Sequence, residues 1–145
     1  MNEEIDFSKF DRGIFMINLV GIIYNPKIKK ILIGRREKDP YVPELGWCFP
    51  GGRPSYDREL GESLKDEIKK KTGLEVEVKD LIFARITPEI KRKQVIVYYY
   101  CETRQEEIKA GEKFVDVKWI FPGEYKNYFQ TSVHQKIAKF LRGLR

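Results

Sequence analysis

Residues 47–76 read WCFPGGRPSYDRELGESLKDEIKKKTGLEV, a short apolar run followed by a glycine turn and a helical pattern. Leu60, Leu64 and Ile68 fall four residues apart, which places them on one face of a helix. Gly73 stands where a helix C-terminal glycine belongs, and lysines crowd the last turn, as the helix dipole favours. The stretch therefore predicts a short strand, a tight turn and an amphipathic helix.

Strand patterns lie on both sides of this helix. The run from Ile14 to Tyr24 is rich in β-branched and large apolar residues, which is typical of a buried strand. Further along, Val115, Val117 and Trp119 alternate with polar residues, so one side of that strand faces the core. The predicted strands cover residues 14–24, 31–33, 74–86, 94–101 and 114–120, and the predicted helices cover residues 60–72 and 131–143. This order predicts an α/β fold in which a mixed β-sheet is sandwiched between helices, an α/β/α architecture.

The C-terminal helix is predicted from the spacing of its apolar side chains. These recur with helical periodicity at Val133, Ile137, Phe140, Leu141 and Leu144. Ser132 and Gln135 resemble a capping box, which predicts that the helix begins at Ser132. His134, the only histidine, then falls in the first turn, either as an exposed residue or as a catalytic one.

Composition favours one domain over residues 1–145, with residues 1–12 as an N-terminal extension. No apolar run approaches the ~20 residues that span a bilayer, and the acidic N-terminus is not a secretory signal, so we expect a cytoplasmic protein without membrane contact. Cys48 and Cys101 have apolar neighbours and are expected to be buried thiols. The net charge of +6 favours anionic partners such as phosphates or nucleic acid.

Residues 47–76 resemble the Nudix box. That family's pattern is Gly, five residues, Glu, seven residues, Arg-Glu, an aliphatic residue, any residue, Glu-Glu, any residue, Gly and an aliphatic residue. From Gly52 onward the chain keeps this spacing without a gap, and Glu67, Ile68 and Gly73 match the pattern. The resemblance implies the Nudix fold, and cleavage of a diphosphate linked to another moiety with the help of magnesium or manganese.

The acidic residues that would hold the metal are largely replaced. Helix positions i, i+3 and i+4 share a face, and here they are Glu67, Lys70 and Lys71, where the family has three carboxylates. Magnesium prefers hard oxygen ligands and is repelled by ammonium groups. In the family, the first Glu and the Arg of the box form an ion pair. Here Arg58 and Asp66 carry swapped signs, which predicts a reversed bridge, or alternatively two unrelated surface charges.

The resemblance and the residue chemistry together nominate site residues. Glu67 is the candidate catalytic residue and, with the Gly52 carbonyl, a residual metal ligand, or it is simply paired with the neighbouring lysines. Lysine and arginine side chains bind phosphate oxygens, so the candidate substrate-binding residues are Arg35, Arg36, Arg53, Lys70 and Lys71. Aromatic rings that could stack on a base, or belong to core or surface, are Tyr41, Trp47, Tyr98 and Tyr100.

Three functions remain open at this stage. The first is recognition of a nucleotide or nucleotide sugar, with hydrolysis weak or lost. The second is an active diphosphate or GDP-sugar hydrolase that takes acids from outside the box, among Glu59, Glu62, Glu112 and Glu124. This version includes a partial likeness to the GDP-mannose mannosyl hydrolase branch, although Lys71 replaces a glutamate of that branch. The third is an RNA-binding or scaffold Nudix domain, and any of the three could form a homodimer.

Overall fold

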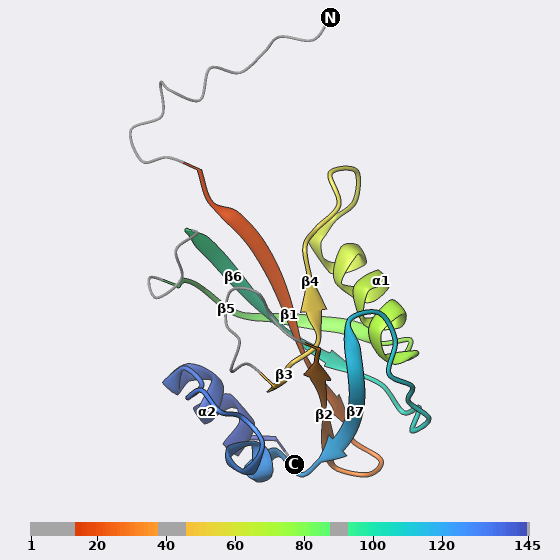
Figure 1. Ribbon diagram of the computed structural model, residues 1–145. Helices are drawn as coiled ribbons and strands as arrows, with labels where there is room; N and C mark the ends of the chain where they lie inside the picture. Colours follow the sequence, from red (N-terminus) through yellow and green to blue (C-terminus); the bar gives the residue numbers. More distant parts are fainter. Residues whose placement is uncertain (1–13, 38–45, 88–92, 145) are drawn as a thin grey trace, which may run out of the picture.

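The computed structural model describes residues 14–37, 46–87 and 93–144, and it has the expected α/β architecture (Figure 1). Residues 1–12 of the expected N-terminal extension lie outside the described part of the chain. The elements are β1 (Met16–Asn25), β2 (Lys30–Arg36), β3 (Trp47–Cys48), β4 (Gly51–Gly52), α1 (Leu60–Thr72), β5 (Glu77–Ile86), β6 (Gln94–Glu102), β7 (Phe114–Ile120), the 3₁₀ helix η2 (Pro122–Asn127) and α2 (Gln135–Arg142).

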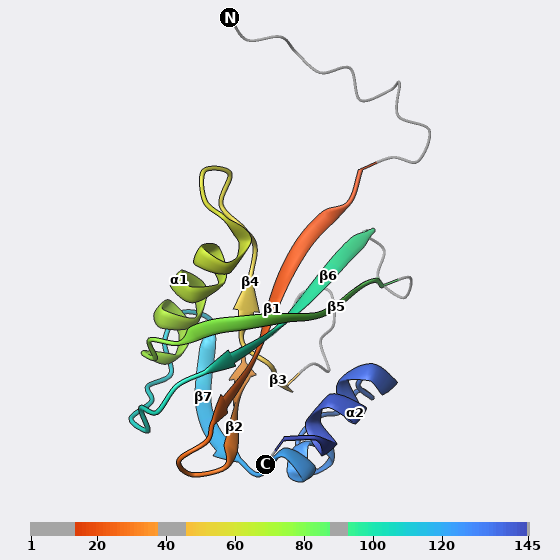
Figure 2. The same cartoon turned by 180° about the vertical axis from the view of Figure 1, so that it is seen from behind.

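Within the described residues the strands form one mixed sheet in the order β3-β2-β1-β6-β5, with β4 pairing to β1 and β7 pairing to β2. β1 runs parallel to β6 and antiparallel to β2. Helix α1 covers one face of this twisted sheet and α2 covers the other, as the two opposite views show (Figures 1 and 2). The predicted mixed sheet between helices is therefore confirmed.

Side chains of β1 point alternately to the two faces of the sheet and contribute to the hydrophobic core on both. Leu19 and Ile23 pack in the cluster beneath α1, while Ile22 and Tyr24 pack in the cluster that includes α2. All four side chains are buried, and the predicted buried strand is confirmed. Because its two faces are both covered, β1 is the central support on which the rest of the fold is placed.

The prediction of α1 is confirmed at both ends. Leu64 and Ile68 are fully buried against the sheet, whereas Leu60 lies at the edge of the apolar stripe and is more exposed. Gly73 adopts a left-handed conformation with φ of 79°, and its N–H donates to the carbonyl of Lys69. Thr72 adds a second stop signal, since its hydroxyl donates to the Ile68 carbonyl and accepts from the Leu74 N–H.

A loop far along the chain completes the C-terminal end of α1. The N–H groups of Lys109, Gly111 and Glu112 donate to the carbonyls of Thr72, Lys71 and Lys70 respectively, over 3.0, 2.9 and 3.2 Å. Helix-terminal carbonyls have no partner within the helix, so this loop satisfies groups that would otherwise need water. The contact also fixes the position of the lysine-rich last turn.

The predicted start of the C-terminal helix is wrong. Helix α2 begins at Gln135, three positions after Ser132, and His134 is the N-cap residue. The imidazole Nδ1 of His134 accepts the N–H of Lys136 at 3.1 Å, so a histidine supplies the cap that the sequence pattern had assigned to a serine. The strand predicted over residues 74–86 also begins later, at Glu77, after a short connection from α1.

None of the helices in the described part of the chain is long and apolar enough to cross a membrane.

The loop contact at the end of α1 predicts a steric effect. A Cβ added at Gly111 would lie 2.0 Å from the backbone oxygen of Lys70, so Gly111→Ala must displace the loop or the helix end. We expect a loss of unfolding free energy of roughly 1–3 kcal/mol, the scale of overpacking, in urea denaturation. Gly123→Ala is the matched control, because a Cβ there meets nothing within 4 Å. Equal stability of the two variants would contradict the role given to the loop.

Candidate functional site

Three charged side chains gather on one face of the last turns of α1. Glu67 lies between two lysines: its Oε1 is 3.9 Å from the Lys70 ammonium and its Oε2 is 3.3 Å from the Lys71 ammonium. The Lys70 side chain is 58% exposed, while those of Glu67 and Lys71 are 21% and 13% exposed. Helical spacing thus brings the residues together as expected, with one lysine in solvent and one largely enclosed.

The glycine turn packs closely against both β1 and this helix face. A Cβ at Gly51 would lie 2.0 Å from the Leu19 carbonyl oxygen, and the turn is tied to β1 by the Gly21 N–H, which donates to the Pro50 carbonyl at 2.8 Å. A Cβ at Gly52 would meet the Glu67 carboxylate at 2.6 Å. Glycine is required at position 51 because backbone atoms fill the space that a side chain would need, whereas a side chain at position 52 would have to displace the Glu67 side chain.

Lys71 links the helix to the glycine turn. Its ammonium donates a short hydrogen bond to the carbonyl of Gly51 and is paired with Glu67. Burial lowers the pKa of Lys71, the Glu67 carboxylate opposes this shift, and the positive charges of Arg36 and Lys113 lower the pKa further. An ammonium group is therefore held by one carbonyl oxygen and one carboxylate oxygen, in a positively charged neighbourhood.

The oxygens available to a divalent cation are already in use. Magnesium demands near-octahedral oxygen coordination, whereas the Gly51 carbonyl and the Glu67 carboxylate both contact the Lys71 ammonium. Across residues 14–37, 46–87 and 93–144, no cluster of three or more His, Cys, Asp or Glu side chains could hold a metal. The residues present do not fit a resident magnesium or manganese ion. Lys71 bridges the Glu67 carboxylate and the Gly51 carbonyl. From the sequence we expect the carbonyl of the next residue, Gly52, at this place.

The candidate arginines are not brought together. Arg35 and Arg36 lie at the end of β2, where the pairing with β7 shifts register, so that Arg35 pairs with Asp116 and Arg36 with Phe114. Arg36 lies within electrostatic range of Lys71, whereas Arg35 stands opposite Trp47 of β3. Arg53 is exposed in the connection between β4 and α1. Of the three arginines, Arg36 is the one whose charge acts on Lys71.

Lys113 is a functional candidate that the sequence pattern did not identify. It lies at the end of the loop that caps α1, adopts a left-handed conformation with φ of 65°, and accepts the Glu37 N–H through its carbonyl. Its charge acts on Lys71 although the two residues are far apart in sequence. The only signal in the sequence was a lysine two residues after a loop glycine, which is too common to be diagnostic.

Arg58 and Asp66 form an ion pair with the signs reversed relative to the Nudix pattern. Arg58 Nη1 lies 2.5 Å from Asp66 Oδ2, and Arg58 Nη2 lies 3.4 Å from Glu62 Oε2. The pair joins the loop after the glycine turn to the outer face of α1. Both side chains are more than two-fifths exposed, so solvent screens the interaction and its contribution to stability is small.

Most of the candidate aromatic rings are occupied by protein contacts. Trp47 packs edge-on against Tyr128, Tyr98 stacks on Phe83, and Tyr100 packs against Phe140. These rings belong to the cluster beneath α2. The imidazole of His134 also rests on Phe83, in addition to capping α2. Tyr41 lies outside the described residues.

The acids considered as substitutes for box glutamates are dispersed. Glu59 is the N-cap of α1, at the opposite end from the lysines, and Glu62 is engaged with Arg58. Glu124 accepts the Phe121 N–H at the start of η2. Glu112 alone lies beside the box lysines, because its N–H bonds to the Lys70 carbonyl.

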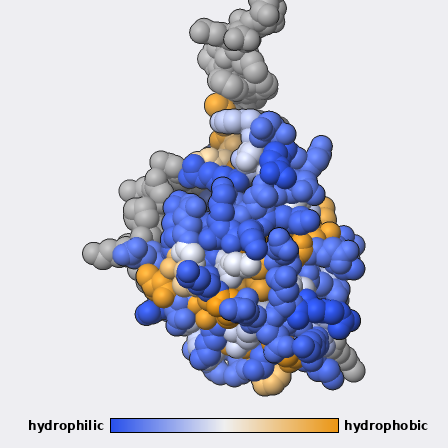
Figure 3. Space-filling view, turned by 90° about the vertical axis from the view of Figure 1, so that its right-hand side faces the viewer, coloured by the Kyte–Doolittle hydropathy of each residue, from blue (hydrophilic) through white to orange (hydrophobic). Residues whose placement is uncertain are grey.

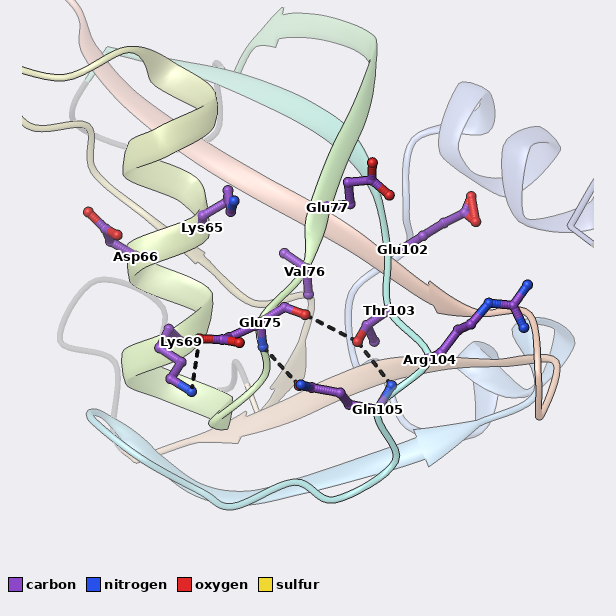
Figure 4. A pocket seen from close by; sticks show the side chains of 10 residues that line it. All are labelled: Lys65, Asp66, Lys69, Glu75, Val76, Glu77, Glu102, Thr103, Arg104 and Gln105. Carbon is purple, nitrogen blue, oxygen red and sulfur yellow. Dashed lines mark hydrogen bonds and ion pairs between the residues drawn. The ribbon is translucent and has the colours of Figure 1, made fainter.

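A separate open groove of about 760 Å³ lies beside α1 (Figure 4). It excludes Gly51, Glu67, Lys70 and Lys71. Its residues come from the outer side of α1 and from the facing ends of β5 and β6, and they are Lys65, Asp66, Lys69, Glu75, Val76, Glu77, Glu102, Thr103, Arg104 and Gln105. Within the groove the Thr103 hydroxyl donates to the Glu75 carbonyl, the Glu75 N–H donates to Gln105 Oε1, and the Lys69 ammonium pairs with the Glu75 carboxylate. The face of the molecule on the α1 side is dominated by hydrophilic residues, with smaller hydrophobic patches (Figure 3).

Nearly the whole chain is similar to known proteins of one family. Residues 15–144 match the family model described as NUDIX domain. A curated relative, the 8-oxo-dGTP diphosphatase of Buchnera aphidicola subsp. Schizaphis graminum (strain Sg), is 34% identical over 125 residues, which cover 86% of this chain and 91% of that protein.

Solved structures with the same fold include the MutT protein from Methanosarcina mazei Go1 and the NUDIX domain of Shewanella oneidensis NrtR complexed with ADP ribose. The first has a TM-score of 0.70 at 17% identity and covers 88% of this chain and 91% of its own. The second has a TM-score of 0.70 at 16% identity and covers 93% of both chains. At such low identity these two structures support the fold alone.

The reversed ion pair predicts a compensating double substitution. Arg58→Glu places three acids together and should lower the unfolding free energy by up to about 1 kcal/mol, as expected for an exposed pair. Restoring opposite charges in R58E/D66R should recover most of that loss, measured as the coupling energy of a double-mutant cycle in urea. Additive losses in the double variant would mean that the two side chains do not interact in solution.

Proposed function

Because this chain belongs to the Nudix family, we propose that it recognises a nucleoside diphosphate linked to another moiety and that its metal-dependent hydrolysis is weak or lost. The single observation that carries this proposal is the position of Lys71. Its ammonium is bound to the Gly51 carbonyl and to Glu67, the retained box glutamate.

Electrostatics supports the loss of metal-dependent chemistry. Two unit charges ~4 Å apart at an effective dielectric near 20 interact by roughly 4 kcal/mol. A divalent cation at Glu67 would face both Lys70 and Lys71, so repulsion outweighs attraction to one carboxylate. The metal would also have to displace the Lys71 ammonium from both of its oxygen partners.

The same charges support phosphate recognition. Lys70 is largely exposed, and the positive charges of Arg36 and Lys113 reach Lys71. Lysine ammonium groups bind phosphate oxygens as compact point charges. The related domain complexed with ADP ribose is a precedent within the fold for a nucleoside diphosphate ligand.

A second candidate is an active nucleotide hydrolase, which the relationship to an 8-oxo-dGTP diphosphatase favours. On this alternative an acid outside the box must assist Glu67. Glu112 is the acid to test, since its backbone is bonded to Lys70. RNA binding and a GDP-sugar substrate have no observation of their own in their favour, so they enter only as arms of the experiment.

We expect no metal-dependent turnover at ordinary enzymatic rates from a panel of ADP-ribose, GDP-mannose, dinucleoside polyphosphates and nucleoside triphosphates that includes 8-oxo-dGTP. Each compound is incubated with magnesium, with manganese and with chelator, and the nucleotide products of cleavage are separated from the substrate and quantified by ion-exchange chromatography. The same compounds and a single-stranded RNA are then titrated calorimetrically, and binding of at least one nucleotide is expected. Fast metal-dependent cleavage that Glu112→Gln abolishes would instead establish the second candidate.

A further inference from the structure

We propose that the Lys71 ammonium is a resident cation, which takes the place of a divalent metal between the glycine turn and α1, and that phosphate groups bind beside it without any metal ion. The first half concerns the folded protein alone. The second half rests on the function proposed above.

The partners of Lys71 are the kinds of atom that bind metal ions. A backbone carbonyl oxygen and a carboxylate oxygen are hard donors, and here both contact the Lys71 ammonium instead. The Gly51 carbonyl and the Glu67 carboxylate both carry negative charge density and are brought close by the tight packing of the turn. They require a positive group between them, and the side chain at position 71 supplies it.

Helix geometry explains how a lysine reaches this position. A helical side chain leans toward the N-terminal end of its helix, over the residue four positions earlier. From position 71 the side chain therefore extends back along Glu67 toward the glycine turn. Lys70, one position earlier, approaches the other oxygen of the same carboxylate from the solvent side. The carboxylate is thus neutralised by two groups of the chain itself.

The ammonium of Lys71 retains capacity for a further acceptor. It has three N–H donors, of which one is directed to the Gly51 carbonyl and another is matched with Glu67. Lys70 and Lys113 add positive charge around it, Arg36 also lies within electrostatic range, and among the described residues Glu67 is the carboxylate that acts on Lys71. The excess positive charge selects an anion, and a phosphate group offers both the charge and several acceptor oxygens.

The position of Lys113 depends on the tertiary fold. The loop that caps α1 bonds through Gly111 to the Lys71 carbonyl and through Glu112 to the Lys70 carbonyl. Lys113 follows directly, so the contact that completes the helix also brings a third basic residue toward the site. This arrangement distinguishes the site from a lysine-rich helix end whose side chains extend into solvent, because a tertiary contact holds several basic residues together.

A resident ammonium reverses the usual effect of magnesium on a nucleotide-binding protein. Magnesium that coordinates the phosphates in solution reduces their negative charge and occupies their oxygens. Binding of ADP-ribose or inorganic pyrophosphate should therefore persist in chelator and weaken when magnesium is added. At a site that requires a metal ion, binding would instead be lost in chelator and strengthened by magnesium.

The first test compares K71M with K69M. Both variants remove one positive charge from the same helix, but Lys69 contacts the Gly73 carbonyl and Glu75, away from the glycine turn. In calorimetric titrations with ADP-ribose and with pyrophosphate in chelator, we expect K71M to weaken binding roughly tenfold to a hundredfold, the scale of one charged hydrogen bond. K69M should bind like the unaltered protein. Equal effects of the two substitutions would overturn the phosphate half of the proposal.

The second test installs a metal site by charge reversal and does not depend on nucleotide binding. K70E/K71E places three carboxylates on the helix face beside the Gly51 carbonyl, and K69E, which reverses a single charge on the same helix, is the control for charge reversal. Circular dichroism first confirms that each variant is folded. In titrations followed by the electron paramagnetic resonance signal of free Mn²⁺, K70E/K71E should bind the ion, and neither the unaltered protein nor K69E should do so.

The outcomes separate this inference from the proposed function. Tight Mn²⁺ binding by the unaltered protein, or by all three proteins alike, would overturn the resident cation. Nucleotide binding that appears only with magnesium would overturn the metal-free phosphate site while leaving nucleotide recognition intact. No nucleotide binding under any condition would overturn the proposed function and the phosphate half, whereas the Mn²⁺ titration would still decide on the resident cation.

Discussion

The packing of α1 directly on β1 is the contact on which the rest of the structure depends. A Cβ at Gly21 would lie 3.0 Å from Ile68 Cδ1 and 3.7 Å from Leu64 Cδ2, so glycine at this point of β1 lets the helix approach the sheet. That approach brings the last turns of α1 beside the glycine turn, which is itself paired with β1. Burial of Leu64 and Ile68 thereby determines which polar side chains lie next to the Gly51 carbonyl.

Once the backbone is placed in this way, the chemistry of the site depends on a few side chains. The scaffold offers a carbonyl and a carboxylate at short range, an arrangement that requires a cation. A chain with acids at positions 70 and 71 would draw that cation from solution, whereas this chain carries it covalently as Lys71. Neither lysine belongs to the buried apolar stripe of α1, which is formed by Leu64 and Ile68. In the function proposed above, the replacement of acids by lysines nevertheless changes the preferred ligand from a cation to an anion.

This separation of scaffold from chemistry is consistent with the comparisons. Structures at 16% and 17% identity retain the fold over most of the chain. Packing tolerates many apolar replacements of similar volume, so distant sequences keep the same backbone. A charged residue at a binding site does not tolerate replacement in this way, because a reversal of its sign changes the local charge by two units. The fold is therefore shared widely, while the activity has to be judged from the side chains of each member.

Sequence alone determined the parts of this protein that depend on local order. The period of Leu64 and Ile68, the stop at Gly73 and the apolar run of β1 predicted their elements correctly, since such patterns reflect helix and strand geometry directly. The grouping of Glu67, Lys70 and Lys71 followed from helical spacing for the same reason. The start of α2 was mispredicted because the pattern assigned the N-cap to Ser132. In the structure His134 is the N-cap, since its imidazole accepts the N–H of Lys136.

Only the tertiary structure decided how these residues are used. No spacing rule indicates that Lys71 reaches the Gly51 carbonyl, twenty residues earlier, that the loop through Gly111 closes the end of α1, or that the charge of Arg36 acts on Lys71. Each of these contacts joins segments distant along the chain. Their geometry follows from how the buried faces of the sheet and the helix fit together, which is a property of the packed molecule and not of any one segment.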